Sequence, residues 1–154
     1  MSDNSNVRIE TIKEFSPEIA LSLRHLAKQL GKNYQELTDA DVKEMLSYPT
    51  HTLFIARDSD SNEVAGMLLC MVYRIPYVRK AYLDDLVVDN SFRGRGIATL
   101  LFKAAIDFAK EQGAAYVDFT SRPLRGAGNN LYEKLGFAKR DTNVYRIIYN
   151  YGEV

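Results

Sequence analysis

Hydrophobic and polar positions follow two periods in the first third of the chain, and each period predicts one kind of element. Residues 7–13 alternate between apolar and polar, which is typical of a strand with one buried face. Helical spacing follows: Ser16 and Pro17 form a favoured start for a helix whose apolar stripe ends before Gly31. A second, shorter amphipathic helix is predicted over residues 38–48.

The middle of the chain predicts three further strands and a long helix, followed by another strand. Continuous or alternating apolar runs mark the strands, and apolar residues at helical spacing mark the helix, which Gly113 ends. The strands cover residues 51–58, 63–74, 82–89 and 114–121, and the helix covers residues 95–112. The strand–helix–strand connection implies that its two strands pair in parallel, with a right-handed crossover.

The last part of the chain predicts a short helix near residues 128–135 and a terminal hairpin with strands at 137–141 and 144–150. The element order is therefore β-α-α-β-β-β-α-β-α-β-β. This order predicts an α/β (α+β) fold with a central mixed, mostly antiparallel sheet, one parallel strand–helix–strand crossover, and helices on both faces. Neither repeats nor a linker interrupt the pattern, so residues 1–154 are expected to form one domain.

Composition narrows the functional classes. The 154 residues carry 20 Lys+Arg and 20 Asp+Glu, so no general basic field favours nucleic acid or an anionic membrane surface. The polar N-terminus and the lack of an apolar run of about 18 residues predict a cytoplasmic protein without a membrane span. The single cysteine, Cys70, lies in an apolar run and is expected to be buried. His25 and His51 show no metal-ligand spacing, so no metal site is predicted.

Residues with a potential for chemistry gather between the fourth strand and the long helix. A helix N-terminus exposes about four unpaired N–H groups, which a Ser, Thr, Asp or Asn side chain usually caps. Here Gly94, Arg95 and Gly96 occupy that position and supply no capping oxygen. Glycines let a ligand approach the backbone, and Arg93 and Arg95 add positive charge, so the segment predicts a phosphate or diphosphate site. The alternative is a glycine loop with two solvated arginines.

Two common phosphate-binding motifs do not fit this segment. A Walker-type loop needs Gly-Lys-Ser/Thr, which is absent from the chain. The dinucleotide fingerprint G-x-G-x-x-G fits at Gly94 and Gly96 but meets Thr99 where the third glycine belongs. The position still favours a ligand, because the turn lies at the carboxyl end of a parallel strand, where open α/β sheets bind their ligands.

A different pattern does match. The segment "RGRGIA" satisfies Arg/Gln-x-x-Gly-x-Gly/Ala through Arg93, Gly96 and Ala98. It follows "LVVDNSF" and is completed downstream by "NNLYEKLGF". Together with the element order, these segments closely resemble the GNAT superfamily of acetyl-CoA-dependent N-acetyltransferases. The stretch 82–98 also resembles the corresponding part of the diamine acetyltransferase branch.

The resemblance implies a site for coenzyme A. In that family the loop amides and the arginine hold the CoA diphosphate, and the preceding strand pairs its backbone with the pantetheine arm. The cofactor-binding residues carried over are Leu86, Val87, Val88, Arg93, Gly94, Arg95, Gly96, Ile97, Ala98, Thr99, Asn129 and Tyr132. The backbone N–H of Val88 is also expected to polarise the thioester carbonyl.

The resemblance further implies catalytic side chains. Tyr132 matches the tyrosine that protonates the leaving thiolate, and Asn129 matches a polar contact to the cofactor. Resembling diamine acetyltransferases use an acid at the Asp84 position to serve the amine. Asp84 is therefore favoured as the base, directly or through water, and the neighbouring Asp85 is the alternative. Alternation along a strand predicts opposite faces for these two side chains.

The function that the resemblance implies is an acetyl-CoA-dependent N-acetyltransferase of the EC 2.3.1 class, acting by direct transfer to a primary amine in a ternary complex. A non-catalytic module that binds CoA or an acyl-CoA is the alternative. The expected partner is a small-molecule or peptidyl amine, and the paired aspartates favour a basic one. The apolar terminal strand is also compatible with a homodimer, whereas nucleic acid and membrane are not expected as partners.

Overall fold

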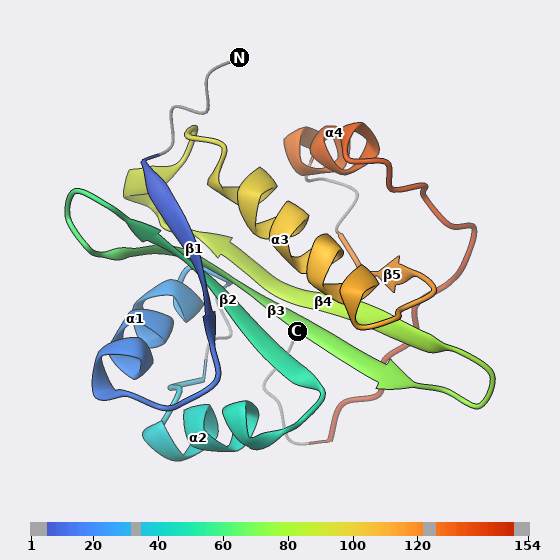
Figure 1. Ribbon diagram of the computed structural model, residues 1–154, viewed down its shortest axis with the longest axis horizontal. Helices are drawn as coiled ribbons and strands as arrows, with labels where there is room; N and C mark the ends of the chain where they lie inside the picture. Colours follow the sequence, from blue (N-terminus) through green and yellow to red (C-terminus); the bar gives the residue numbers. More distant parts are fainter. Residues whose placement is uncertain (1–5, 32–34, 122–125, 150–154) are drawn as a thin grey trace. The chain divides into compact units, whose positions relative to one another are not determined.

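The computed structural model describes residues 6–31, 35–121 and 126–149 (Figure 1). The chain divides into two compact units, Met1–Phe119 and Thr120–Val154. The first unit contains β1 (Val7–Ile12), α1 (Pro17–Ala27), α2 (Asp39–Ser47), β2 (His51–Asp58), β3 (Val64–Arg74), β4 (Arg79–Val88), the 3-10 turn η1 (Asn90–Phe92), α3 (Ile97–Glu111) and β5 (Val117–Asp118). The second unit contains α4 (Gly126–Lys134).

The strands of the first unit form one sheet in the order β1-β2-β3-β4-β5. The first four strands are antiparallel neighbours, and β5 pairs in parallel with β4 after the crossover through α3. Helix α3 covers one face of this sheet, and α1 and α2 lie on the opposite face (Figure 1). The predicted fold class is confirmed: the sheet is mixed and mostly antiparallel, and helices lie on both faces.

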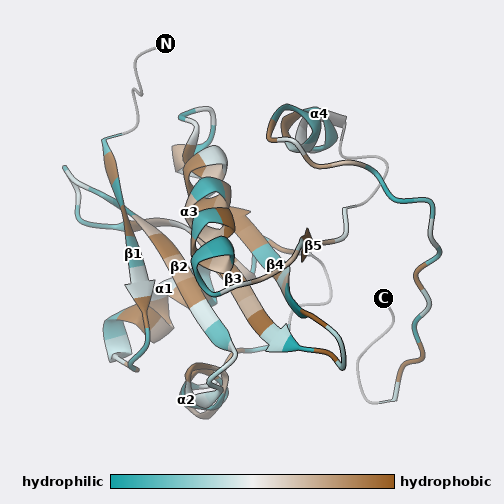
Figure 2. Cartoon of the chain, turned by 45° about the vertical axis from the view of Figure 1, so that its right-hand side comes forward, coloured by the Kyte–Doolittle hydropathy of each residue, from teal (hydrophilic) through white to brown (hydrophobic). Residues whose placement is uncertain are grey.

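Alternation along β2 divides the hydrophobic core between the two faces. Leu53 and Ile55 belong to the cluster formed with α1 and α2. Phe54, which lies between them, contacts Phe108 of α3 with ring centroids 5.6 Å apart. The buried helix residues of the first cluster are Ile19, Ala20, Leu23, Leu26, Ala27 and Val42. Figure 2 shows the corresponding long hydrophobic stretches in β2, β3 and β4, and the hydrophilic positions of α1 and α3.

The first two helices begin where the sequence predicts, because local side chains satisfy their first N–H groups. At α1, the Ser16 hydroxyl accepts a hydrogen bond of 3.2 Å from the Ile19 N–H. At α2, Thr38 and Asp41 form a reciprocal capping box. The Asp41 N–H donates to Thr38 Oγ1 at 3.2 Å, and the Thr38 N–H donates to Asp41 Oδ2 at 2.8 Å.

A β-bulge interrupts β4 near its middle. The register with β3 shifts between Met67 and Leu69, where Asp85 and Leu86 together oppose the single residue Leu68. Asp85 has a φ of 51°, a left-handed value that is uncommon for a residue other than glycine. Bulges of this kind bend a strand and occur often next to active sites.

The fifth strand is shorter than predicted. The sequence pattern extends from 114 to 121, whereas β5 covers Val117–Asp118 and pairs with Ala81 and Tyr82 of β4. The pattern marks residues that can form a strand, but ladder bonds form only where a neighbouring backbone runs alongside. The described part of β4 beyond Tyr82 therefore continues without β5 beside it.

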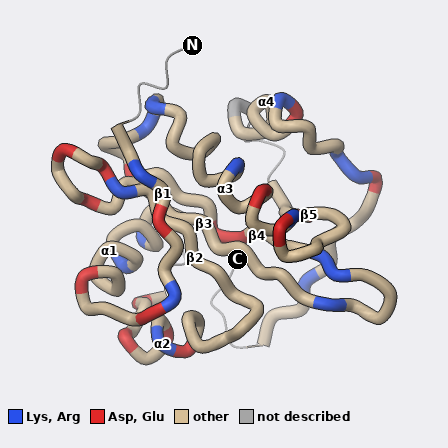
Figure 3. Tube along the Cα trace, viewed as in Figure 1, with Lys and Arg blue, Asp and Glu red and all other residues tan. Residues whose placement is uncertain are grey.

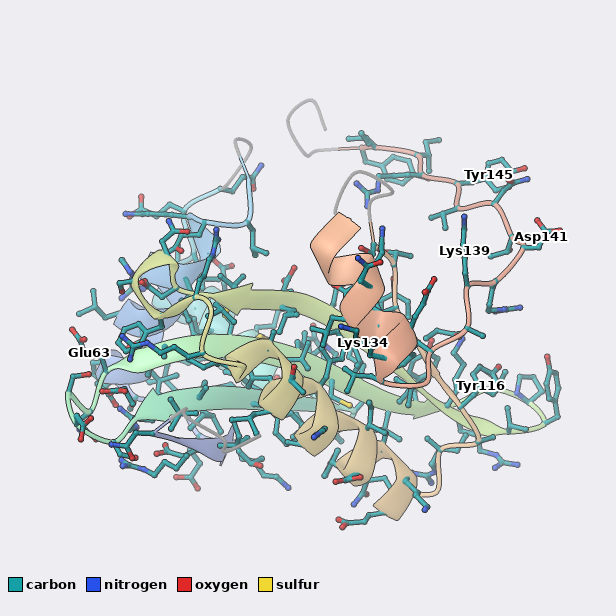
Figure 4. All side chains as sticks on the ribbon, turned by 90° about the horizontal axis from the view of Figure 1, so that it is seen from above. Glu63, Tyr116, Lys134, Lys139, Asp141 and Tyr145 are labelled. Carbon is teal, nitrogen blue, oxygen red and sulfur yellow. The ribbon has the colours of Figure 1, made fainter. Side chains whose placement is uncertain are left out.

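The predicted terminal hairpin is wrong for the described residues. Residues 137–149 contain no strand, and Val144, Tyr145 and Ile147 are 72%, 87% and 73% exposed. Figure 4 shows Tyr145 extending from this irregular segment. Apolar alternation identifies residues that suit a buried strand face, but a two-stranded hairpin is marginal in water without further partners. The structure supplies no such partner within residues 137–149.

Candidate active site

The candidate site begins at the turn that joins β4 to α3. Gly94 and Gly96 have φ values of 77° and 76°, and no side chain caps α3 at its N-cap residue, Gly96. The first helical hydrogen bond runs from the Leu100 N–H to the Gly96 carbonyl at 3.2 Å, so the preceding amides have no acceptor within the helix. These amides belong to Ile97, Ala98 and Thr99. A Cβ at either glycine would meet no atom within 4 Å, so the backbone is open to a ligand.

The two arginines of this turn differ in their contacts. Arg93 Nε donates to the carbonyl oxygen of Val88 at 3.3 Å, which holds the side chain beside the end of β4. The Arg95 guanidinium stacks on Phe92, 5.0 Å from the ring centroid. Arg95 Nη1 also lies 3.9 Å from Oδ1 of the buried Asp58, which offsets part of the positive charge that Arg95 brings to the turn.

The end of β4 presents a backbone donor that its pairing with β3 leaves unused. The Asp89 N–H donates to the Ala65 carbonyl at 2.8 Å. Neighbouring residues of an antiparallel strand point their N–H and C=O groups to opposite edges, so the Val88 N–H points away from β3. The described pairing of β5 with Ala81 and Tyr82 does not reach Val88. The expected contact of this N–H with the cofactor stays a prediction.

The other two residues expected to contact the cofactor along this strand are part of the fold. Val87 is 4% exposed and belongs to the cluster with α1 and α2, and Leu86 is half-buried in the bulge. The Val87 side chain is therefore a packing group, and only its backbone is available for recognition.

The two aspartates lie in the bulge, where Figure 3 shows a red stretch within β4. Asp84 pairs across the sheet with Leu69, and its Oδ1 accepts a hydrogen bond of 3.0 Å from the Asp85 N–H. Asp85 is exposed, but nearby protein atoms partly desolvate its carboxyl and raise its pKa, and the neighbouring Asp84 carboxylate raises it further. The simple alternation that predicts opposite faces does not apply here, because the bulge inserts a residue and Asp85 is left-handed.

Sequence reasoning missed the role of Asp89, which is 7% exposed at the end of β4. Ser91 donates to its Oδ1 through its N–H at 2.8 Å and its hydroxyl at 2.5 Å. His25 of α1 and Gln29, in the turn after α1, donate to its Oδ2. Burial raises the pKa of Asp89, but the bonds from Ser91, Gln29 and His25 outweigh that effect and hold it well below its usual range. The available signal was local: aspartate two residues before serine, directly after a strand, favours a side-chain-bonded turn.

The single cysteine is unsuited to nucleophilic chemistry. Cys70 is fully buried, as the sequence predicts, and burial raises the pKa of its thiol to about 11. The reactive thiolate is therefore scarce at neutral pH. Among the residues that the structure describes, no three His, Cys, Asp or Glu side chains come together to hold a metal ion. None of the helices in the described ranges has the length and apolar character needed to cross a membrane.

Asn129 and Tyr132 lie on α4, in the second unit, and both are partly buried. The Tyr132 phenol packs over Gly128, where an added Cβ would lie 3.4 Å from the phenolic oxygen. The Tyr132 carbonyl accepts a hydrogen bond of 3.0 Å from the Phe137 N–H. The expected approach of Asn129 and Tyr132 to a cofactor held at the β4–α3 turn stays a prediction.

The sheet with its α3 crossover is an architecture shared with acetyltransferases of known structure. An aminoglycoside acetyltransferase from an uncultured soil metagenomic sample matches with a TM-score of 0.80 at 20% identity, over 94% of this chain and 97% of that chain. The fold is therefore that of an acyltransferase domain. A model of the acetyltransferase (GNAT) family matches residues 20–137, and this chain belongs to that family. The matched region runs across the boundary between the two units.

Curated relatives carry the same family activity in their names. N-acetyltransferase 8B of Homo sapiens is 27% identical over 139 residues, which cover 86% of this chain and 61% of the relative. N-alpha-acetyltransferase 30 of Schizosaccharomyces pombe is 32% identical over 100 residues, which cover 64% of this chain and 61% of the relative. The matches thus span 61% of the length of each of these two relatives.

Proposed function

We propose that this protein is an N-acetyltransferase that moves the acetyl group of acetyl-CoA directly to a primary amine. The observation that carries the proposal is the start of α3, where Gly96 is left-handed, no side chain caps the helix, and the space beside the glycines is open. Unpaired N–H groups and the helix dipole together favour an anion at such a position. Membership of the GNAT family supports CoA as the molecule that brings the diphosphate.

In this proposal the turn residues bind the diphosphate of CoA, and β4 binds the thioester carbonyl. Arg93 and the first-turn amides of α3 hold the diphosphate, with the Thr99 hydroxyl as an additional donor. Arg95, held by Phe92 and Asp58, contributes charge from the side of the turn. The Val88 N–H, directed away from β3, donates to the thioester carbonyl and stabilises negative charge as it develops there.

Proton transfer from the amine is assigned to the aspartates of the bulge. Asp84 is the base that the resemblance favours, directly or through water. The raised pKa of Asp85 makes it the competing base, because a general base works best when its pKa lies near the working pH. Separate Asp84→Asn and Asp85→Asn variants decide between them: the true base is the one whose loss removes the acidic limb of the kcat/KM profile.

Tyr132 is proposed as the general acid that protonates the leaving thiolate, and Asn129 as a polar contact to the cofactor. Tyr132→Phe is expected to lower kcat by roughly 10²- to 10⁴-fold while the CoA dissociation constant changes little, because only the proton donor is removed. Rapid-quench turnover and calorimetry measure the two effects. Unchanged turnover in Tyr132→Phe would remove this residue from the mechanism.

The amine acceptor is proposed as a cationic primary amine, supported by the two acidic side chains in the bulge. The names of the similar proteins extend from N-alpha-acetyltransferase to aminoglycoside acetyltransferase, so they support the reaction type rather than one acceptor. A panel of polyamines, amino acids, aminoglycosides and peptides, assayed for CoA release, identifies the acceptor class.

The binding step is tested by calorimetry with CoA. Wild-type protein is expected to bind, and Gly96→Glu to weaken binding by about tenfold or more, because a carboxylate beside the free amides repels the diphosphate. Gly113→Glu is the matched control: its φ of 80° is equally left-handed, its surroundings are equally open, and it follows the opposite end of α3. Absence of heat with wild-type protein, or equal binding by Gly96→Glu, would overturn the proposal.

The catalytic step is tested by initial rates with both substrates varied. Direct transfer predicts intersecting lines in double-reciprocal plots, whereas a covalent enzyme intermediate predicts parallel lines. Tight CoA binding without turnover of any amine in the panel would instead support the non-catalytic CoA-binding module.

A further inference from the structure

The Asp89 carboxylate accepts hydrogen bonds both from its own turn and from a part of the chain that is distant in sequence. Its side chain is 10% exposed, and both carboxylate oxygens are engaged. Oδ1 accepts both bonds from Ser91, within the turn itself. Oδ2 accepts from Nε2 of His25, in the last turn of α1, at 2.5 Å and from Nε2 of Gln29, in the turn that follows α1, at 3.0 Å. A buried carboxylate needs such partners, and here half of them come from a part of the chain that is distant in sequence.

Gln29 binds the turn with both ends of its amide group. Its Nε2 donates to Asp89, and its Oε1 accepts a hydrogen bond of 3.0 Å from the Asn90 N–H. The side-chain amide thus bridges two consecutive residues that follow β4. Gln29 lies 60 positions before Asp89 in the chain, so this contact exists only because the fold brings α1 to the end of β4.

His25 lies four residues before Gln29, within α1, and contacts the same carboxylate oxygen. Its side chain is 66% exposed, so hydrophobic packing does not explain why the ring is held against Asp89. The contact requires only that Nε2 carries a proton, which holds for the imidazolium and for one neutral tautomer. The ring is therefore a donor aimed at Asp89 rather than a member of the core.

The backbone around Asp89 leads directly into the proposed diphosphate loop. The Asp89 N–H is bonded to Ala65 of β3, and its carbonyl accepts from the Phe92 N–H at 2.9 Å. Arg93 follows immediately, and its Nε is bonded back to Val88. The direction in which the chain leaves β4, and hence the position of Arg93, depends on how Asp89 is held.

We propose that His25, Gln29 and Asp89 form a positioning network by which the end of α1 and the turn after it fix the loop that binds the diphosphate of acetyl-CoA. The inference rests on the proposed function, since it assigns these residues to the same site. The three residues touch neither the diphosphate nor the reacting atoms; they act through the backbone of residues 89–93. A loop that is already fixed in its binding conformation has a higher affinity for its ligand, because less conformational entropy is lost on binding.

The first test measures steady-state kinetics of Gln29→Ala and Asp89→Asn with acetyl-CoA as the varied substrate. The KM for acetyl-CoA is expected to rise by about tenfold, with kcat at saturation changed by less than about twofold, because the loop is displaced but the reacting groups are not. A general loss of folded protein would lower kcat and leave KM unchanged. Lys28, the exposed C-cap residue of α1 and the neighbour of Gln29, supplies the matched control: Lys28→Ala is expected to behave as wild type.

The second test needs neither catalysis nor a ligand. Amide hydrogen exchange of residues 90–97 is expected to be faster in Gln29→Ala than in wild type and Lys28→Ala, while exchange in β2 and β3 stays the same. His25→Gln keeps a donor and is expected to lie between wild type and His25→Ala. Equal exchange in all variants, or an unchanged KM for acetyl-CoA, would overturn the positioning network. A different result separates the two proposals. If the variants exchange faster but the wild-type protein binds no CoA, the network still supports the loop and the proposed function is refuted.

Discussion

At the scale of single residues, glycines meet two different physical needs in this chain. At Gly94 and Gly96 the need is conformational, since both have a left-handed φ and open space around an added Cβ. At Gly66 the need is space. A Cβ there would lie 2.9 Å from the carbonyl oxygen of Val87 and 3.2 Å from Leu101 Cδ1. Gly66 therefore allows β3, β4 and α3 to approach closely.

Gly66→Ala is expected to lower the free energy of unfolding by about 1–3 kcal/mol, because the Val87 oxygen belongs to the backbone and cannot rotate away as a side chain would. Urea denaturation followed by circular dichroism measures the change. Gly31→Ala is the control, since an added Cβ there meets no atom within 4 Å. A Gly66→Ala protein as stable as wild type would contradict the close approach of β3 to β4 and α3.

At the scale of elements, the bulge in β4 places a left-handed backbone and a carboxyl group with a raised pKa at the same residue, Asp85. Asp85 has a left-handed φ, which asparagine and aspartate adopt more readily than most residues other than glycine. Local desolvation and the Asp84 carboxylate raise the pKa of Asp85, so the folded protein binds this proton more tightly than the unfolded chain does. Proton binding by Asp85 therefore makes its full contribution to the free energy of unfolding below the unfolded pKa of about 3.9. This contribution is lost as pH rises through the folded pKa.

Asp85→Asn is accordingly expected to be more stable than wild type at neutral pH, because it removes the charge and keeps the favoured backbone. The gain is expected to shrink as pH falls and to disappear below about 3.9, where the wild-type carboxyl becomes protonated in both the folded and the unfolded state. Thermal unfolding of both proteins between neutral pH and about pH 3.9 measures this stability difference. Asp107→Asn, on the exposed side of α3, is the control. A difference between wild type and Asp85→Asn that does not vary with pH would argue against the raised pKa.

Elements were predictable where a segment's own residues decide its structure. The starts of α1 and α2 follow from Ser16 and from the Thr38–Asp41 pair, and the open start of α3 follows from its glycines. The short β5 and the missing strands in residues 137–149 were not predictable, because a strand also requires a partner whose backbone runs beside it.

At the scale of the whole molecule, the position of the single thiol bears on the reaction. Cys70 lies within the sheet, fully buried, with its pKa raised to about 11. Cys70→Ala is expected to keep kcat within about twofold of wild type, because a protonated, inaccessible thiol is not a nucleophile. Native protein is also expected to resist iodoacetamide until urea unfolds it. Loss of turnover in Cys70→Ala, together with parallel initial-rate lines, would indicate an acetyl-cysteine intermediate instead.

The whole molecule also brings together groups that no local pattern connects. Asp89 was readable as the start of a turn, but its partners His25 and Gln29 lie 64 and 60 positions earlier in the chain. Helix α1 could be predicted from its stripe of apolar residues, whereas the contact of its polar face with the end of β4 depends on how the helix packs against the sheet.

The sequence by itself determined the order and kind of most elements, the glycine turn before α3 and the family, because periodicity, caps and left-handed positions are properties of residues close together in the chain. The tertiary structure decided the bulge at Asp85, the outward direction of the Val88 N–H and the hold of α1 on Asp89. Each of these depends on which backbone lies beside which. Which backbones become neighbours is decided by the free energy of the whole fold, so it cannot be predicted from any single segment.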